Sequence, residues 1–274
     1  MKDIAYINNL PDITSVTPTI CELFQIPRPP QCKSREITEV VKIKNKILNS
    51  KTIQKALIYA PDAIGMDLHI KFPTEFNILQ TNTHIQLELK SMIPAKTPVC
   101  FASMFTGTTP DNHGIKKYEK PVLKIDTLFD VLVQSQKKVA IVAVKDSSID
   151  KIFRERSIDY YSESYDNEVT QKALSLLDKD YYDFILIYHQ EYDDQLHKTN
   201  PYSDQAFAAM KRHIHSFFTF KEKMNVVWKK YNRMILFAPD HGAHLDLEKG
   251  NGDHGLNIPE DMYIKHYYSF YENE

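Results

Sequence analysis

The sequence has no long apolar run and no recognisable export signal. No stretch approaches the roughly 18 uninterrupted apolar residues of a membrane-spanning helix. The first residues, MKDIAYINNLPDITSV, do not place an apolar segment after a basic one, as a secretory signal would. We therefore expect a cytoplasmic protein without a membrane partner.

Cysteine is scarce, and its placement excludes two kinds of stabilising site. The three cysteines, Cys21, Cys32 and Cys100, are scattered along the chain and form no CxxC pair. This pattern predicts neither a disulfide framework nor a thiolate zinc site. It fits a reducing compartment.

Glycine is also scarce, with seven residues in the chain. Most of them lie beside polar clusters: Gly65, Gly107, Gly114, Gly242, Gly252 and Gly255. Because glycine permits close approach of backbones, this grouping favours a site built at strand ends.

The chain carries no excess of charge of one sign. Its 34 basic and 36 acidic residues give a net charge of -2, which argues against long nucleic acid as a partner. Hydrophobic content of 42% is typical of globular proteins, and 274 residues suffice for one large domain with its own core. No repeat or linker divides the chain. We expect a single domain over residues 1–274, with residues 1–50 as a flank packed on it.

Short, almost continuously hydrophobic runs alternate with helix-compatible stretches. Such runs are typical of strands covered on both faces, as in a parallel sheet between helices. The predicted strands are Ala56–Ala60, Ile85–Leu89, Val139–Val144, Phe184–Tyr188 and Met234–Ala238. The predicted helices are Pro18–Phe24, Ile125–Gln136, Asn167–Asp178 and Ser203–Lys230. The alternation predicts an α/β fold with a mainly parallel central sheet sandwiched between helices. The tail, Tyr263–Tyr271, is expected to form an amphipathic edge strand.

Three of the predicted strands run directly into acidic or histidine residues, in ALIYAPD, FILIYHQEYD and MILFAPDHG. Ligand sites of open α/β sheets form beyond the carboxyl ends of the strands, so these residues are expected to converge. Carboxylates and imidazoles together are ligands that suit zinc, and six of them can serve two metal ions. The pool consists of Asp62, Asp193, His197, Asp240, His241 and His254.

Each of these residues also has a structural interpretation. Asp62 resembles a turn residue or a helix N-cap, and His254 a loop histidine. Asp193 and His197 share one face of a helix, where an exposed polar pair has the same spacing. In the longest predicted helix, His213 and His215 are expected at the surface rather than at a metal.

Thr97 precedes a proline at the start of a predicted helix. The amides and dipole of a helix N-terminus favour an incoming phosphoryl anion, although an N-cap threonine has the same appearance. A threonine hydroxyl needs a metal ion or a base to become a nucleophile.

The segment after Thr97 and the later clusters resemble the alkaline phosphatase superfamily, most closely its nucleotide pyrophosphatase/phosphodiesterase branch. In that branch the nucleophilic threonine is followed nine positions later by Thr-Gly, and then by a Pro-containing turn that ends in His-Gly-Ile. Here Thr97 is followed by Thr106-Gly107, and residues 110–115 complete the turn. The resemblance extends from about Ala56 to Gly255.

The resemblance implies a two-zinc hydrolase that cleaves phosphodiester or pyrophosphate bonds of small phosphate esters, such as nucleotides, through a phospho-threonine at Thr97. A phosphomonoesterase and a non-catalytic metal-binding relative are the alternatives. By the same resemblance, one zinc is held by Asp193, His197 and His254, and the other by Asp62, Thr97, Asp240 and His241.

One position departs from the family pattern. Family phosphodiesterases usually carry an asparagine three positions after the nucleophile, where this chain has Cys100. A thiol is a poor donor, so the zincs, the backbone at Pro98 and Val99, or Lys96 must stabilise the phosphoryl oxygens. Cys100 as the nucleophile is the competing interpretation, and a buried helix cysteine is the one we favour.

Overall fold

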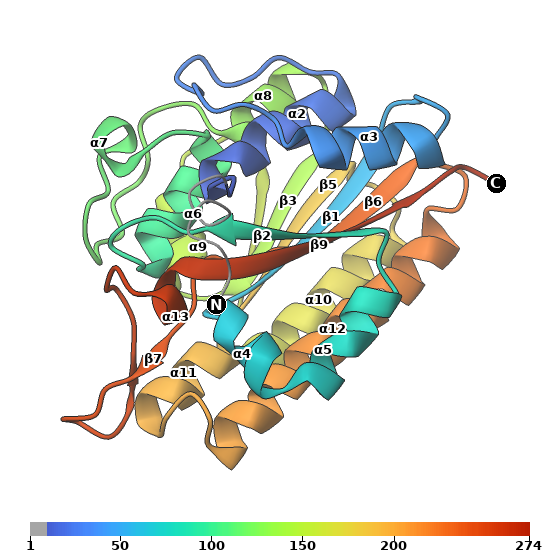
Figure 1. Cartoon of the computed structure of the whole chain (residues 1–274). Helices are drawn as coiled ribbons and strands as arrows, with labels where there is room; N and C mark the ends of the chain where they lie inside the picture. The colour runs from blue at the N-terminus through green and yellow to red at the C-terminus, as the bar shows by residue number, and fades with distance from the viewer. Residues whose placement is uncertain (1–9) are drawn as a thin grey trace.

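A computed structural model describes residues 10–274 and is built around a seven-stranded sheet (Figure 1). The strand order is β2-β9-β6-β1-β5-β3-β4. The strands β6, β1, β5, β3 and β4 are parallel, and β9 is antiparallel to both of its neighbours. The bounds are β1 Lys55–Pro61, β2 Ile85–Lys90, β3 Val139–Val144, β4 Asp159–Glu163, β5 Phe184–His189, β6 Arg233–Phe237 and β9 Tyr263–Tyr271.

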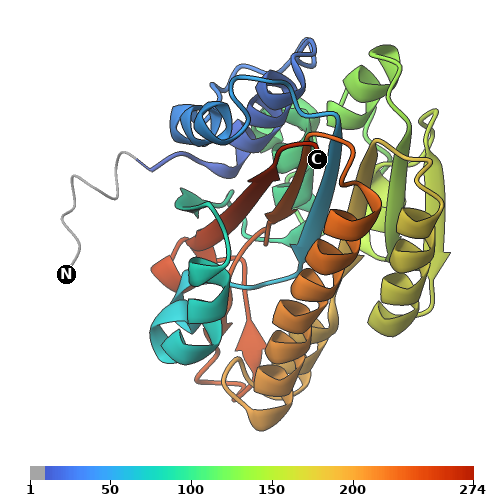
Figure 2. The same cartoon turned by 90° about the vertical axis from the view of Figure 1, so that its right-hand side faces the viewer.

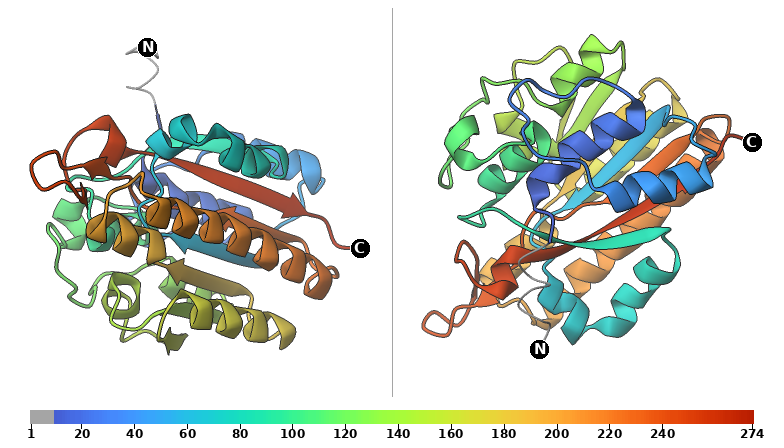
Figure 3. Two further views of the ribbon diagram at one scale, coloured as in Figure 1. Left: turned by 90° about the horizontal axis from the view of Figure 1, so that it is seen from below. Right: turned by 45° about the horizontal axis from the view of Figure 1, so that its top comes forward.

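Helices cover both faces of this sheet, which confirms the predicted α/β sandwich (Figure 3). One layer contains α2 Val16–Phe24, α3 Thr38–Ile47, α6 Thr97–Thr106, α8 Leu128–Gln134 and α9 Ser148–Ile152. The other contains α5 Pro73–Thr81, α10 Asp166–Asp178, α11 Glu191–Lys198 and α12 Asp204–Val227. Figure 2 shows α10 and α12 side by side along the sheet. Shorter elements are η1 Ile13–Ser15, α4 Met66–Lys71, α7 Pro110–His113, α13 Pro259–Met262, β7 His244–Leu245 and β8 Gly252–Asp253.

Alternation along β1 explains why its sequence is hydrophobic throughout. Ala56 and Ile58 pack into the core beneath α2 and α6, whereas Leu57 and Tyr59 pack into the core beneath α10 and α12. Every residue of β1 is buried. A strand with two buried faces has no polar side, as expected for the centre of a parallel sheet.

The edge position predicted for the tail strand is wrong. The segment Tyr263–Tyr271 is not an edge strand, because β9 pairs with β6 on one side and with β2 on the other. Phe270 and Tyr268 are consequently buried. The edge positions belong to β2 and to β4, whose sequence, DYYSE, has no apolar run and was not predicted as a strand.

The N-terminal flank contains more regular structure than its sequence suggests. Besides the predicted helix at α2, residues 38–47 form α3, and buried Val40 lies in the same core as α2. Within residues 10–274 no helix has the length and apolar character to cross a membrane.

Candidate active site

The predicted residues meet because they follow three adjacent strands. The strands β5, β1 and β6 lie side by side and are parallel, so their carboxyl ends open at one edge. Asp62 follows β1 directly, Asp240 and His241 follow β6, and α11 begins two residues after β5. The structure brings all seven predicted residues to this edge, in two clusters that share no ligand.

One cluster consists of Asp62, Asp240 and His241, all of them buried. His241 Nε2 lies 3.4 Å from Asp62 Oδ1 and 3.3 Å from Asp240 Oδ2. Thr97 Oγ1 is 3.3 Å from His241 Nε2 and 3.3 Å from Asp62 Oδ2. The threonine hydroxyl therefore faces the same point as the three ligand-type side chains.

The other cluster consists of Asp193, His197 and His254. Asp193 Oδ1 lies 3.4 Å from Nε2 of each histidine, and the two Nε2 atoms are 3.1 Å apart. Asp193 and His197 are one turn apart on α11, as the spacing predicts. The rings of His254 and His241 stack with centroids 4.1 Å apart, so the two clusters are neighbours.

Backbone carbonyls orient the three imidazoles. Nδ1 of His197 contacts the Gly252 carbonyl at 2.9 Å, and Nδ1 of His254 contacts the Ala95 carbonyl at 2.7 Å. His241 Nδ1 contacts its neighbouring carbonyl at 2.9 Å. A carbonyl accepts, so each Nδ1 carries the proton and donates. In each neutral ring Nε2 then carries the free lone pair, an arrangement found in metal-binding histidines.

The carboxylates offer free acceptor atoms at the same points. Asp62 Oδ1, Asp193 Oδ1 and Asp240 Oδ2 are buried and have no hydrogen-bond partner among residues 10–274. A buried carboxylate oxygen without a partner is costly unless a cation compensates it. The donor set and these orphaned oxygens fit two divalent cations.

Burial alters the protonation of the Asp62 cluster. Burial, with the nearby charge of Asp193, raises the pKa of Asp62 to about 8, and burial with the charge of Asp62 raises that of Asp240 well above its ordinary value. Burial lowers the pKa of His241 well below its usual range, so the ring stays neutral. A divalent cation here would favour the ionised carboxylates, because it supplies the missing opposite charge.

The N-terminus of α6 offers fewer amides than its sequence suggests. Pro98 has no N–H, and the amides of Val99 and Cys100 donate to the Lys96 carbonyl at 2.9 and 3.0 Å. The cap residue of α6 is Lys96, so Thr97 is not an N-cap. Residues 98–100 therefore leave no free amide in the first turn of α6.

Lys96 and Cys100 have other partners. Lys96 Nζ lies 3.3 Å from Asp253 Oδ1. Cys100 is fully buried, accepts a hydrogen bond from Ser91 at 3.1 Å, and has its pKa raised by burial and by the charge of Asp240. A buried neutral thiol fits the structural role that we favoured for Cys100.

Tyr188 belongs to the site, although the sequence did not single it out. Its buried hydroxyl donates to Asp62 Oδ2, the oxygen that also accepts from Thr97. Tyr188 is the penultimate residue of β5, next to β1 in the sheet. The signal that the sequence offered for this residue was a tyrosine near the end of a hydrophobic strand.

Two glycines allow the loops after β1 and β6 to touch. A Cβ atom on Gly65 would lie 2.7 Å from Gly242 Cα, and one on Gly242 would lie 1.9 Å from the Glu260 carbonyl oxygen. No side chain fits at either position. The predicted clustering of glycine at the site has a physical cause here, because these loops carry Asp62, Asp240 and His241.

A further buried group, formed by Asp166, His189 and His213, resembles a metal site but has complete hydrogen bonding. His213 Nε2 accepts from the Tyr192 amide, so its Nδ1 carries the proton and donates to Tyr59 Oη at 3.1 Å. An N–H cannot ligate a metal. The surface position predicted for His213 is wrong, because α12 packs this ring against α10 and α11; His215 is exposed, as predicted.

This buried group instead holds the N-terminus of α11. The carboxylate of Asp166 accepts hydrogen bonds from the amides of Gln190 and Glu191, at 3.0 and 2.9 Å. Together with the bond from Tyr192 to His213, these contacts satisfy amides that a helix start leaves free. They fix the helix that carries Asp193 and His197.

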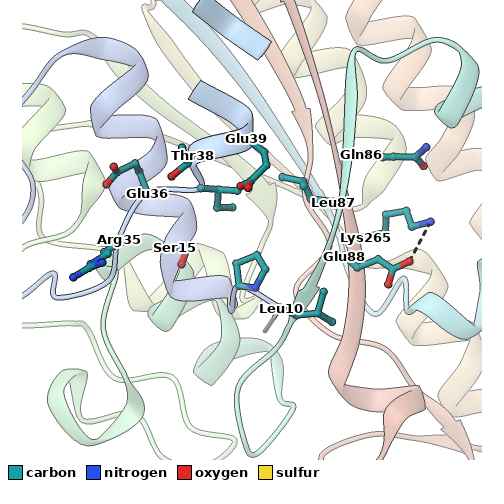
Figure 4. Close-up of a pocket in the computed structure, with 12 residues that line it drawn as sticks. Leu10, Ser15, Arg35, Glu36, Thr38, Glu39, Gln86, Leu87, Glu88 and Lys265 are labelled. Atoms are coloured by element: carbon teal, nitrogen blue, oxygen red, sulfur yellow. Dashed lines mark ion pairs between the residues drawn. The ribbon is translucent and has the colours of Figure 1, made fainter. Parts of the chain in front are cut away.

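A pocket of about 140 Å³ opens in front of Thr97 and Asp62. Its lining includes both Thr97 and Asp193. A larger pocket of about 720 Å³ lies elsewhere, between residues 10–39 and β2, where Glu88 pairs with Lys265 (Figure 4). None of the predicted site residues lines that larger pocket.

Comparisons with known proteins agree with the fold. The fold is similar to that of mouse ectonucleotide pyrophosphatase/phosphodiesterase 5, solved as an inactive form with AMP, at 17% identity and a TM-score of 0.57. The alignment covers 72% of this chain and 59% of the mouse chain. The fold is also similar to the periplasmic domain of a phosphoethanolamine transferase from Campylobacter jejuni, at 15% identity, a TM-score of 0.56, and coverage of 83% and 82%.

No curated protein sequence matches the chain. The family model for type I phosphodiesterase/nucleotide pyrophosphatase matches residues 75–243, a segment that includes Thr97, Asp193, His197, Asp240 and His241 but neither Asp62 nor His254. Because this match covers more than half of the sequence, the chain belongs to the type I phosphodiesterase/nucleotide pyrophosphatase family of the alkaline phosphatase superfamily.

Proposed function

We propose that this chain is a metal-dependent hydrolase that cleaves phosphodiester or pyrophosphate bonds in small substrates through a phospho-threonine at Thr97. One observation carries the proposal: three orphaned carboxylate oxygens and three histidine Nε2 atoms form two adjacent clusters beside the Thr97 hydroxyl. Membership of the family supports the class of reaction.

Each cluster would hold one divalent cation. Asp193, His197 and His254 form one ligand set, and Asp62, Asp240 and His241 form the other with the oxygen of Thr97. Mixed carboxylate and imidazole ligands suit zinc. When bound, such a pair of cations stabilises charge on the attacking and leaving oxygens of an in-line displacement.

The chain itself orients the nucleophile. Thr97 Oγ1 forms a bond to phosphorus while the bond from phosphorus to the leaving oxygen breaks. Asp62 Oδ2 accepts the hydrogen bond of the threonine hydroxyl at 3.3 Å, so it is positioned to take the proton. Tyr188 donates to the same oxygen and fixes its direction. Water then displaces Thr97 from phosphorus and restores the hydroxyl.

The test uses bis-p-nitrophenyl phosphate, zinc-loaded protein and the variant Thr97→Ala. We expect Thr97→Ala to keep bound zinc and to lose turnover by at least about 1,000-fold, since no nucleophile remains. Thr109→Ala, which changes an exposed threonine, is the matched control. Full hydrolysis by Thr97→Ala, even after chelation, would reject the mechanism.

A parallel assay with p-nitrophenyl phosphate distinguishes diester from monoester cleavage. We expect the diester to be preferred. Preference for the monoester would indicate that the chain is a phosphomonoesterase that uses the same residues, and not a phosphodiesterase.

A further inference from the structure

The pocket in front of Thr97 has a basic wall that the mechanism above does not use. Lys120, Lys145 and Ser148 line this pocket together with Asp62 and Asp193. Lys145 directly follows β3, which is the neighbour of β5 in the sheet. Its position is therefore set by the end of a strand adjacent to those that position the two clusters.

Neither ammonium group on this wall pairs with a carboxylate among residues 10–274. Lys120 Nζ donates to a backbone oxygen, the carbonyl of Asp146, at 2.9 Å. Lys145 Nζ has no hydrogen bond or ion pair within the described part of the chain. The carboxylate of the next residue, Asp146, pairs with Lys151.

A hydroxyl on the same wall is also unused. Ser148 is 3% exposed, and its Oγ forms no hydrogen bond with any residue that the structure describes. The neighbouring Ser147, by contrast, is engaged as the cap of α9 and accepts from the Asp150 amide. Two ammonium groups without an ion pair and one hydroxyl without a hydrogen bond, within the described part of the chain, line one small pocket. They match an anion, because phosphate and carboxylate oxygens accept from both kinds of donor.

The wall is close enough to the clusters to act on the same molecule. Burial lowers the pKa of Lys120, while the negative charges of Asp146 and Asp62 oppose that shift. Burial and the charges of Asp62 and Asp193 raise the pKa of Tyr118, which lines the pocket beside Lys120. Because Thr97, Asp62 and Asp193 line the same pocket of about 140 Å³, an anion held by these lysines would occupy the pocket that Thr97 lines.

We propose that Lys120, Lys145 and Ser148 bind a second anionic group of the substrate, a phosphate or a carboxylate, next to the phosphorus that Thr97 attacks. The inference rests on the proposed function and narrows its substrate class to phosphate esters or anhydrides that carry a second anion. Neutral substituents on the phosphate would leave the two ammonium groups without an anionic partner.

Binding of phosphonates to the zinc-loaded protein, measured by calorimetry, tests the proposal. Methylenediphosphonate carries a second phosphonate and ethylphosphonate does not; 3-phosphonopropionate carries a carboxylate and propylphosphonate does not. We expect a preference of about tenfold or more for at least one compound with two anionic groups over its match with one. The preferred member identifies the second anion as phosphate-like or carboxylate-like.

Variants assign the preference to the wall. Lys145→Gln combined with Lys120→Gln is expected to remove it, Lys145→Arg to retain most of it, and the control Lys124→Gln, at an exposed lysine, to leave it unchanged. Equal affinity for the compounds with one and with two anionic groups, or a preference that survives the double variant, would overturn the inference. Hydrolysis of bis-p-nitrophenyl phosphate is measured alongside: its absence contradicts the proposed function, whereas hydrolysis without an anion preference contradicts this inference alone.

Discussion

The Nε2 atoms of His197 and His254 lie 3.1 Å apart, while Nδ1 of each ring contacts a backbone carbonyl. In two neutral rings these Nε2 lone pairs face each other, and Asp193 Oδ1 lies 3.4 Å from both. Three acceptors directed at one point repel one another, and a shared cation removes that repulsion.

Chelation should therefore weaken the fold as well as the activity. A ligand that binds only the native state stabilises it by about 4 kcal/mol at 1,000 times its dissociation constant. We expect a lower Tm in a chelator, restored by added zinc, as measured by differential scanning calorimetry. An unchanged Tm across the zinc titration would argue against cation binding at these clusters.

Asp240→Asn should remove the cation of the Asp62 cluster. A neutral amide binds zinc poorly, and Asp240 Oδ2 is one of the orphaned oxygens. We expect metal content, measured by plasma emission, to fall by about one equivalent, and most turnover to be lost. Asp246→Asn changes a carboxylate that pairs with Lys249 outside both clusters, so it should keep the full metal content.

Asp166→Ala should loosen α11 from a distance. It leaves the amides of Gln190 and Glu191 without acceptors, which costs about 1–3 kcal/mol for each buried unsatisfied group. We expect a lower free energy of unfolding in urea and weaker zinc binding by Asp193 and His197. The control is Asp178→Ala, at the exposed end of α10, the helix that begins at Asp166. Destabilisation with unaltered zinc affinity would show that Asp166 does not position α11.

His69 should make the metal-free protein sensitive to acid. Its ring stacks on Phe76, and burial lowers its pKa to about 3. Because the folded pKa lies below the unfolded value of about 6.5, the contribution to stability is complete above that pH and is lost as the pH falls towards 3. In chelator, we expect the free energy of unfolding of His69→Phe to fall by roughly 2 kcal/mol less than that of wild type between pH 7 and pH 5.

Urea unfolding at several pH values measures this difference. His215→Gln, which removes an exposed histidine of α12, is the comparison variant. Parallel stability profiles for wild type and His69→Phe would contradict the assignment.

Much of the site was predictable because it depends on local order in the sequence. Asp62 and Asp240 follow hydrophobic runs that only buried strands require, and parallel strands end at one edge. Asp193 and His197 have the spacing of one helical turn. These relations need no knowledge of distant contacts.

Other features depend on long-range pairing, which the sequence does not encode locally. The tail strand is interior only because β2 pairs with its outer side. His213 is buried because α10 and α11 cover its face of α12, and nothing in the helix sequence distinguishes it from His215. Tyr188 joins the site through a hydrogen bond to a neighbouring strand.

Gly242→Ala should disrupt the site without altering any ligand. The new Cβ would lie 1.9 Å from the Glu260 carbonyl oxygen, so the backbone must move. We expect the free energy of unfolding to fall by at least about 2 kcal/mol, together with lower zinc affinity. Gly250→Asn, at a turn with open space and a φ of 76°, should be tolerated. Wild-type stability of Gly242→Ala would mean that the loops separate at little cost.

The contact between Gly65 and Gly242 joins two main chains with no side chain between them. Main-chain contacts have no rotamers, so thermal motion cannot change the spacing of these two turns through side-chain rearrangement. The distance between Asp62 and the pair Asp240–His241 is thus fixed by covalent geometry and strand pairing. A rise in temperature should therefore change the affinity for substrate and cations at this edge less than it changes the conformation of the surrounding loops.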